Sequence, residues 1–304
     1  MMYRVTVVLI VALSASLAAQ NMSPAARTTV ANPDGAPIVI PRAKQYDITS
    51  RLNGKTYRIM VAPPFGADPQ KAYPVVYLLD GNAYFAIAAD ALTRQSMRIV
   101  APAIVVGIGY PLDDPWEVER RRFLDLTPWV SKQSLSGGQE TGGGDMFLRV
   151  IEEEVKPFVS ARYRIDAAKQ TIYGQSIGGL MVLRVRFRNP TAFSTYVISS
   201  PSIWYNDRQI LQDEDAFAKR ARAGELKLRI LITSAGDEQY RGSDPKLLAA
   251  DNRQVDNASE LADRLAALNP GSVAVTRTIF EGENHGTVPT VSLNRALRFA
   301  LPRD

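Results

Sequence analysis

The sequence predicts an α/β fold built around a mostly parallel sheet with helices on both faces. Short runs rich in β-branched and aromatic residues alternate with longer segments of helical periodicity along most of the chain. One such run, residues 75–79, is continuously apolar, which is typical of a strand covered on both faces. Another, residues 171–173, leads through a glycine-rich turn directly into a helical pattern.

The individual elements follow from these patterns in chain order. Strands are predicted at residues 57–61, 75–79, 104–108, 171–173, 196–199, 230–234 and 273–279. Helices are predicted at residues 84–98, 145–158, 179–188, 252–268 and 291–300. Residues 109–144, rich in proline and ending in a glycine-rich stretch, interrupt the alternation. We predict a long lid-like loop there that faces the substrate.

The N-terminus has the pattern of a secretory signal. Arg4 supplies the positive charge, residues 5–17 form an apolar run too short to span a bilayer, and Ala18-Ala19 suits cleavage. Residues 1–19 are therefore predicted as a signal peptide, residues 20–41 as a flexible start of the mature protein, and residues 42–304 as one domain. The protein is expected to be exported, periplasmic or secreted, without stable membrane insertion after signal removal. An uncleaved anchor is the alternative.

Composition excludes several kinds of chemistry. The 304 residues include no cysteine and one histidine, which rules out thiol catalysis, disulfides and cysteine-ligated metals. Zinc enzymes usually need two or three histidines. The net charge of +5 is mildly basic, but no basic helix or aromatic-interleaved stripe points to nucleic acid. A single imidazole paired with a serine is the minimum that a serine hydrolase requires.

The candidate nucleophile is Ser176, in the motif Gly174-Gln175-Ser176-Ile177-Gly178. The motif lies between a predicted strand and a predicted helix, and this context is what identifies a nucleophile elbow. Its glycines are needed because the turn is sharp and side chains would collide beside the serine. A glycine-rich packing turn is the alternative.

The candidate base and acid follow later strands. His285 comes directly after the last predicted strand, in a loop that can return over the carboxyl edge of the sheet. Asp237 and Glu238 follow the strand at 230–234, and a carboxylate there would orient the imidazole. Glu238 is preferred and Asp237 is second, while a Ser–His dyad without a contacting acid stays open.

An acyl-transfer site also needs two backbone donors for the developing oxyanion. One is predicted to be the amide of Ile177, directly after the nucleophile. The other is predicted at the turn after residues 75–79, where the Asn82 amide is preferred and Gly81 is second. An ordinary strand–helix turn is the alternative.

Two further features are candidates for substrate contact. Trp204 follows the strand at 196–199 and either forms a flat wall of the pocket or packs in the core. Arg121 and Arg122 lie in the predicted loop, where guanidinium groups would suit carboxylate, phosphate or catecholate oxygens. A solvated run of charge is the alternative for the two arginines.

Six segments between about residues 45 and 300 together resemble the putative-esterase family of α/β-hydrolases, which includes esterase D, the mycolyltransferases and the enterochelin-type siderophore esterases. These segments are residues 73–82, 121–128, 143–147, 173–179, 199–204 and 281–285. The motifs Leu-Asp-Gly-Asn at 79–82, Asp-Leu-Thr-Pro at 125–128 and Ser-Pro-Ser-Ile-Trp at 200–204 are most similar to the periplasmic IroE-like branch, which opens trilactone siderophores.

The resemblance implies an α/β-hydrolase fold, with Ser176 as nucleophile, His285 as base, and Asn82 and Ile177 as oxyanion donors. It also implies that the acid often stands where Glu238 stands, although the siderophore-cleaving branch can lack or displace it.

The predicted function is hydrolysis of a small-molecule carboxylic ester through an acyl-serine, with an iron–siderophore complex as one candidate substrate. This chemistry requires no metal or organic cofactor. Two alternatives stay open: an acyltransferase that uses the same serine and histidine, and an exported binding protein of the same fold without catalysis.

Overall fold

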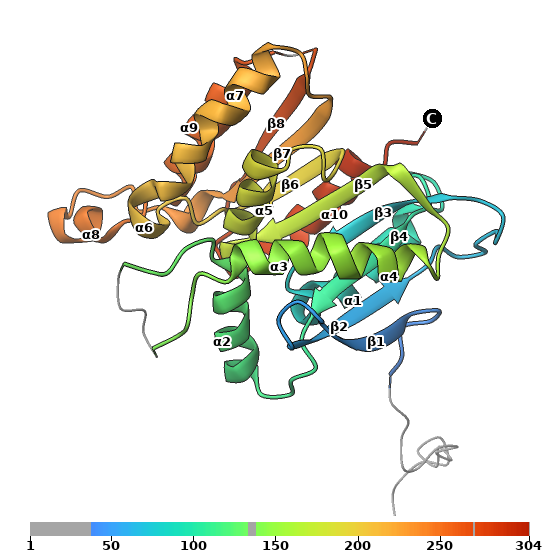
Figure 1. Cartoon of the computed structure of the whole chain (residues 1–304). Helices are drawn as coiled ribbons and strands as arrows, with labels where there is room; N and C mark the ends of the chain where they lie inside the picture. The colour runs from blue at the N-terminus through green and yellow to red at the C-terminus, as the bar shows by residue number, and fades with distance from the viewer. Residues whose placement is uncertain (1–37, 133–137, 270, 304) are drawn as a thin grey trace, which may run out of the picture. The chain divides into compact units, whose positions relative to one another are not determined.

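A twisted sheet forms the centre of the molecule. Within residues 38–132, 138–269 and 271–303, which this computed structural model describes, eight strands pair in the order β1-β2-β4-β3-β5-β6-β7-β8 (Figure 1). β2 is antiparallel to both β1 and β4, and the remaining neighbours are parallel, which confirms the predicted mostly parallel sheet. The strands are β1 (Lys44–Thr49), β2 (Thr56–Ala62), β3 (Tyr73–Leu78), β4 (Ile104–Gly109), β5 (Ile165–Gln175), β6 (Thr195–Ser199), β7 (Leu228–Ala235) and β8 (Val273–Phe280).

Helices cover both faces of this sheet. Figure 1 shows α3, α4 and α5 on one side and α1 and α10 on the other. The five predicted helices are present as α1, the run from α3 to α4, α5, α9 and α10, with ends shifted by a few residues. The α-helices are α1 (Gly81–Gln95), α2 (Pro115–Leu126), α3 (Gly144–Val150), α4 (Lys156–Ser160), α5 (Ile177–Arg188), α6 (Tyr205–Arg208), α7 (Glu214–Arg222), α8 (Pro245–Ala250), α9 (Gln254–Ala266) and α10 (Val288–Ala300). A π-helical turn, η2 (Ile151–Val155), joins α3 to α4, and η3 (Gln209–Asp213) and η4 (Gly236–Glu238) are short 3-10 helices.

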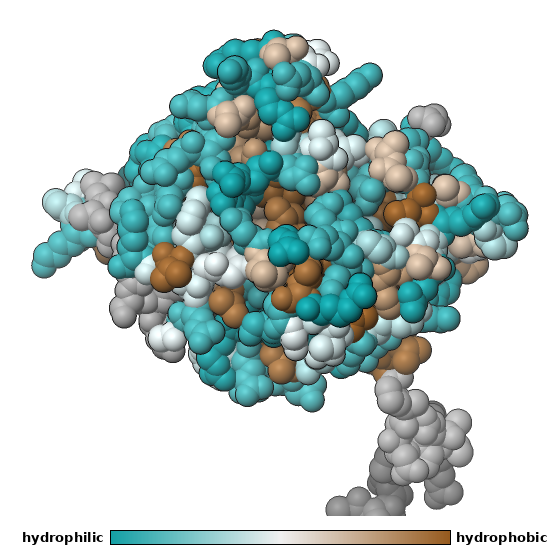
Figure 2. Space-filling view, in the orientation of Figure 1, coloured by the Kyte–Doolittle hydropathy of each residue, from teal (hydrophilic) through white to brown (hydrophobic). Residues whose placement is uncertain are grey.

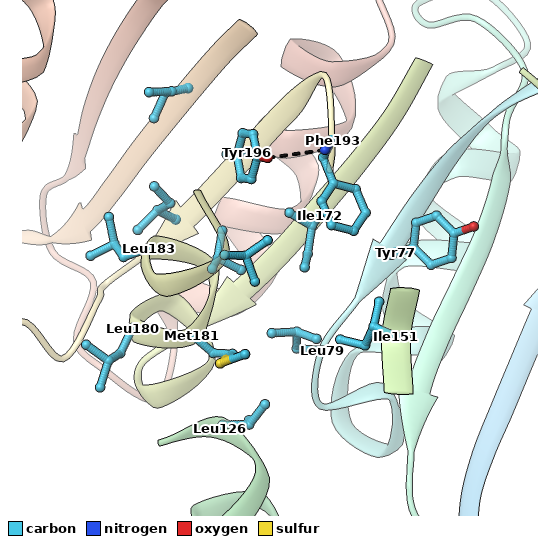
Figure 3. Packing of buried hydrophobic residues seen from close by; sticks show 14 of the residues in the cluster. Tyr77, Leu79, Leu126, Ile151, Ile172, Leu180, Met181, Leu183, Phe193 and Tyr196 are labelled. Atoms are coloured by element: carbon cyan, nitrogen blue, oxygen red, sulfur yellow. Dashed lines mark hydrogen bonds between the residues drawn. The ribbon is translucent and has the colours of Figure 1, made fainter. Parts of the chain in front are cut away.

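The segment that contains β3 explains why its sequence is continuously apolar. Val75, Tyr77 and Leu79 pack into the core beneath α3 to α5, whereas Val76 and Leu78 pack beneath α1 and α10. Successive side chains of a strand point to opposite faces, so both sets are buried. Figure 3 shows the first of these cores, where side chains from the sheet, η2 and α5 meet. Each such side chain stabilises the fold by about 1.5–3 kcal/mol.

The outer surface contrasts with these cores. Figure 2 shows that the face seen in Figure 1 is largely hydrophilic, with apolar residues interspersed. Among the described residues, no helix combines the length and apolar character needed to cross a bilayer. Residues 40–304 form one compact unit. The predicted signal peptide, and most of the predicted flexible segment at 20–41, lie outside the described residues.

β1 and α2 were not predicted from the sequence, and neither were α6, α7, α8, η3 and η4. β1 is an edge strand with four of its six residues exposed, so it lacks the apolar run that marked the other strands. α2 lies inside residues 109–144, so the expectation of one long irregular loop was wrong there. Asp114 caps this helix by accepting the amide of Trp116 at 2.9 Å, and Pro115 occupies the first helical position. Leu126 is its one fully buried apolar side chain among the described residues, so the helix has almost no apolar stripe to reveal it.

Candidate active site

Ser176 lies on a strained turn at the carboxyl end of β5. Its backbone angles, φ 60° and ψ −120°, are ones that residues with a side chain rarely adopt. The turn is held because the Ser176 amide donates to the carbonyl of Ser199 at 3.0 Å, and α5 begins at the next residue. The serine side chain is thereby presented at the edge of the sheet rather than within it.

The glycines of the motif are required by close backbone contacts. A Cβ atom on Gly174 would lie 2.2 Å from the carbonyl oxygen of Gly178, and one on Gly179 would lie 2.7 Å from that of Ser199. Neither neighbour is a flexible side chain, so any larger residue would displace the turn. The local sequence therefore fixes the position of Ser176.

Three side chains from separate strand ends form a continuous hydrogen-bonded chain. His285, in the loop after β8, has Nε2 at 2.9 Å from Ser176 Oγ and Nδ1 at 2.7 Å from Glu238 Oε1. The Glu238 side chain is 1% exposed, whereas that of His285 is 50% exposed. The other oxygen of Glu238 accepts the amide of Ala235 at 2.9 Å, which fixes the carboxylate after β7.

The structure distinguishes the two candidate acids by position. Glu238 contacts the imidazole, whereas Asp237 is exposed and its amide donates to the carbonyl of Glu283 at 3.0 Å. Asp237 and Glu238 both belong to the short helix η4. The catalytic roles of these residues stay predictions.

Gln175 and Tyr84 also support the loop that carries His285, and neither was predicted from the sequence. Gln175 Nε2 donates to the carbonyl of His285 at 3.3 Å and lies 3.4 Å from its Nε2. The Tyr84 hydroxyl donates to Gln175 Oε1 at 3.1 Å. Gln175 occupies the variable position of the Gly-x-Ser-x-Gly motif, so the motif itself gave no signal for it.

Asn82 and Ile177 lie in the first turns of two helices that start at neighbouring strand ends. β3 and β5 are adjacent and parallel, so α1 and α5 begin at the same edge. First-turn amides of a helix have no acceptor within it and carry its positive end. The Asn82 side chain is anchored by two bonds to the Tyr110 backbone, at 2.7 and 2.9 Å. The amides of Asn82 and Ile177 can therefore donate hydrogen bonds to an anion at this edge.

A cavity of about 400 Å³ opens between these elements. Ser176, His285, Asn82 and Ile177 all line it, together with aromatic side chains and part of α2. Trp204 lines the same cavity and also packs against the core, so its contact with a substrate stays a prediction. The volume of the cavity is in the range of small-molecule sites, about 300–1,000 Å³.

A second cavity, also of about 400 Å³, adjoins the first on the side of Glu238. The two share Ser176, Ser202, Trp204 and His285. The second is more polar, because its other lining residues are Glu238, Asp251, Asn252 and Gln254. The serine hydroxyl therefore lies where two differently lined spaces meet.

The two arginines proposed for anionic substrates are engaged by carboxylates instead. Arg121 donates to Asp125 at 2.9 Å, lies over the rings of Tyr57 and Tyr110, and is absent from the lining of the cavity. Arg122 does line the cavity, but its guanidinium is held by Asp80. Within the described residues, no cluster of three or more histidine or acidic side chains could hold a metal ion.

Comparison with known families identifies the family of the chain. Residues 49–277 match the family model described as "Putative esterase", which covers most of the chain. The protein belongs to the putative-esterase family. It is thus a carboxylic ester hydrolase of the α/β-hydrolase fold, as the resemblance implied.

Relatives cover nearly the whole of this esterase. The ferri-bacillibactin esterase BesA of Bacillus subtilis is 37% identical over 87% of this chain and 91% of its own. The solved structure of the BES protein from Bacillus cereus is 34% identical, with a TM-score of 0.79 over 91% of this chain and 100% of its own. An IroE-like serine hydrolase from Shewanella oneidensis is 25% identical, with a TM-score of 0.69 over 84% of this chain and 79% of its own.

Proposed function

We propose that this protein hydrolyses carboxylic esters through an acyl-serine intermediate on Ser176, with His285 as the base and Glu238 as the orienting acid. The observation that carries the proposal is the unbroken chain from Ser176 Oγ through the imidazole to the buried carboxylate, with links of 2.9 and 2.7 Å. A carboxylate in that position holds the tautomer whose Nε2 accepts the serine proton.

The proposed reaction has two halves. His285 takes the Ser176 proton as Oγ attacks the ester carbonyl, and the Asn82 and Ile177 amides stabilise the oxyanion. The imidazolium then protonates the departing alkoxide, which leaves as the alcohol. Water repeats the attack on the acyl-serine with His285 as base, and the carboxylic acid leaves. No metal or organic cofactor takes part in these steps.

Hydrolysis is favoured over acyl transfer by the exposure of the base. The His285 side chain is 50% exposed, so water can reach the imidazole that would activate it. An acyltransferase would need to exclude water in favour of an acceptor alcohol. A binding protein without catalysis would have no need of a strained serine within hydrogen-bond distance of an imidazole.

The proposed substrate class is a siderophore ester, in its iron-free or ferric form. Support comes from the ferri-bacillibactin esterase, which is alike over nearly the full length of both chains. The two adjoining cavities also offer space on both sides of the scissile bond, for the acyl part and the alcohol part. We further propose that the protein is exported, because residues 1–19 have the pattern of a signal peptide.

Labelling with a fluorophosphonate tests the nucleophile directly. The purified protein should be labelled and should hydrolyse p-nitrophenyl esters, whereas Ser176→Ala and His285→Ala should lose turnover. Persistent turnover in the serine variant would reject the assignment. A panel of linear esters, iron-free trilactones and ferric trilactones then tests the substrate class, and equal or better turnover of linear esters would contradict it. Export predicts a mature N-terminus near residue 20, which N-terminal sequencing of the periplasmic or secreted protein would reveal.

A further inference from the structure

Arg122 forms a buried ion pair beside the proposed oxyanion donors. Its Nε and Nη2 donate to the two carboxylate oxygens of Asp80 at 2.8 and 2.9 Å, in a bidentate arrangement. Its Nη1 donates to Glu119 at 3.2 Å. The side chains of Arg122 and Asp80 are 15% and 7% exposed. With all three guanidinium nitrogens engaged, Arg122 is poorly placed to take a charge on the substrate.

Asp80 occupies the position that directs the first turn of α1. It has left-handed backbone angles, φ 54° and ψ 46°, and directly precedes Gly81 and Asn82. Its carbonyl accepts the amides of Ala83 at 2.9 Å and Tyr84 at 3.2 Å. The orientation of Asp80 therefore sets the direction in which the Asn82 amide points.

The Asp80 carboxylate also borders the nucleophile turn. A Cβ atom on Gly178 would lie 3.2 Å from Asp80 Oδ2, so the carboxylate packs against the residue that follows Ile177. The ion pair thus lies between the two segments that carry the proposed donors. Because Arg122 belongs to α2, it links this helix to both segments.

We propose that Arg122 is a positioning residue: through Asp80, it holds the first turn of α1 so that the Asn82 amide faces the carbonyl oxygen of the bound ester. This inference rests on the proposed function, in which Asn82 is an oxyanion donor. α2 then serves transition-state stabilisation rather than recognition of an anionic group on the substrate.

The bidentate geometry is what the role requires. A planar guanidinium fixes both the distance and the orientation of a carboxylate, whereas a lysine ammonium makes a point contact and leaves the carboxylate free to turn. Loss of one oxyanion donor costs about 10²–10³ in kcat, so a misdirected donor should cost less, about 10–100-fold. The donor acts on charge that develops only in the transition state, so KM should change little.

The test compares Arg122→Lys with a matched control, Arg184→Lys. Arg184 also donates with three nitrogens to two carboxylates, those of Asp145 and Asp213, and its side chain is 6% exposed. It lies outside the lining of both cavities at Ser176. With p-nitrophenyl butyrate, Arg122→Lys should lower kcat by about 10–100-fold with KM within about threefold, whereas Arg184→Lys should stay within about threefold in both.

Two further readouts separate positioning from other roles. The rate of inactivation by a fluorophosphonate should fall in parallel with kcat in Arg122→Lys, because that adduct also develops charge on the oxyanion. A substrate-binding role would instead raise KM for an anionic ester, such as the p-nitrophenyl half-ester of succinate, and leave kcat for the neutral ester unchanged. Either that pattern or an unchanged kcat would overturn the proposal.

Folding and the proposed function are controlled separately. If Arg122→Lys does not fold, as judged by thermal unfolding, Asp80→Asn should give the same loss in kcat alone, and a normal kcat in that variant would overturn the proposal. Failure of the proposed function would appear differently, as a wild-type protein that neither reacts with the fluorophosphonate at Ser176 nor hydrolyses esters.

Discussion

The carboxyl edge of the sheet and the buried face of α5 place charged groups under different constraints. At the edge, His285 contacts Glu238 and Arg122 contacts Asp80, so each charged side chain has a fixed partner. On α5, Arg186 is fully buried, and its guanidinium nitrogens have no hydrogen-bond partner in the described part of the chain. Fixed partners at the edge orient groups for a reaction, whereas Arg186 is tolerated by packing alone.

The largest expected effect at the edge is the loss of the carboxylate that orients His285. Glu238→Gln keeps the shape of the side chain but removes its charge, so the imidazolium loses its stabilisation. We expect kcat for p-nitrophenyl butyrate to fall by about 10²–10⁴-fold. Asp237→Asn is the matched control, because Asp237 is exposed and its amide bonds to Glu283, and it should stay within about threefold of the wild-type kcat. An unchanged kcat in Glu238→Gln would favour a Ser–His dyad, and an equal loss in Asp237→Asn would contradict the assignment of Glu238 as the acid that acts on His285.

A second way to disrupt the carboxyl edge is to add a side chain that clashes within the turn around Ser176. Gly179→Ala would bring a Cβ to 2.7 Å from the Ser199 carbonyl oxygen and 3.0 Å from Pro201 Cα, both of them backbone atoms. We expect the free energy of unfolding to fall by about 1–3 kcal/mol and kcat to fall with it. In the control Gly271→Ala, the added Cβ would meet nothing closer than 3.5 Å, so urea unfolding and kcat should be nearly unchanged. A fully stable, fully active Gly179→Ala would show that the turn is not tightly packed.

These contrasts show how far the sequence could predict the edge. The Gly-x-Ser-x-Gly motif and the single histidine led to Ser176 and His285, which the structure places in hydrogen-bond contact. Asp237 and Glu238 are adjacent in a short turn, so their orientation depends on backbone angles that composition does not encode.

Arg121 and Arg122 show a related limit of prediction from the sequence. Arg121 and Arg122 are neighbours in sequence, but on a helix successive residues point about 100° apart. They consequently reach different acids, Asp125 and Asp80. The helix had to be recognised first, and α2 was missed because its surface is mostly polar, although Asp114 and Pro115 carried a start signal.

The buried face of α5 gives the opposite expectation, a gain in stability. The Arg186 guanidinium lies over the rings of both Phe187 and Phe217, at 4.1 and 4.0 Å from their centroids. Burial lowers its pKa to about 9, against the opposing effect of the Glu214 charge. Two cation–π contacts, each worth about 1–2 kcal/mol, do not offset a desolvation cost of several kcal/mol.

Arg186→Met should therefore raise the free energy of unfolding by about 1–2 kcal/mol without changing kcat. Calorimetry should show a higher Tm. Arg184→Met is the contrasting variant, because it leaves the carboxylates of Asp145 and Asp213 without their partner, and it should lower the Tm. A lower Tm in both variants would mean that the aromatic contacts of Arg186 outweigh its desolvation.

The smallest expected effect comes from the hydroxyl of Tyr84, at the margin of the edge network. Tyr84→Phe keeps the ring that packs against Tyr173 and removes the bond to Gln175, whose amide supports the His285 carbonyl. One hydrogen bond of this kind is worth about 1 kcal/mol, so kcat should fall by about three- to tenfold. Tyr163→Phe also removes a tyrosine hydrogen bond, to Tyr46 at 3.1 Å, at the opposite end of β5 from Ser176, and should leave kcat unchanged. An unaltered kcat in Tyr84→Phe would show that Glu238 and the strained turn suffice to hold the imidazole. Residues that reach His285 only through Gln175 would then have no effect on its position.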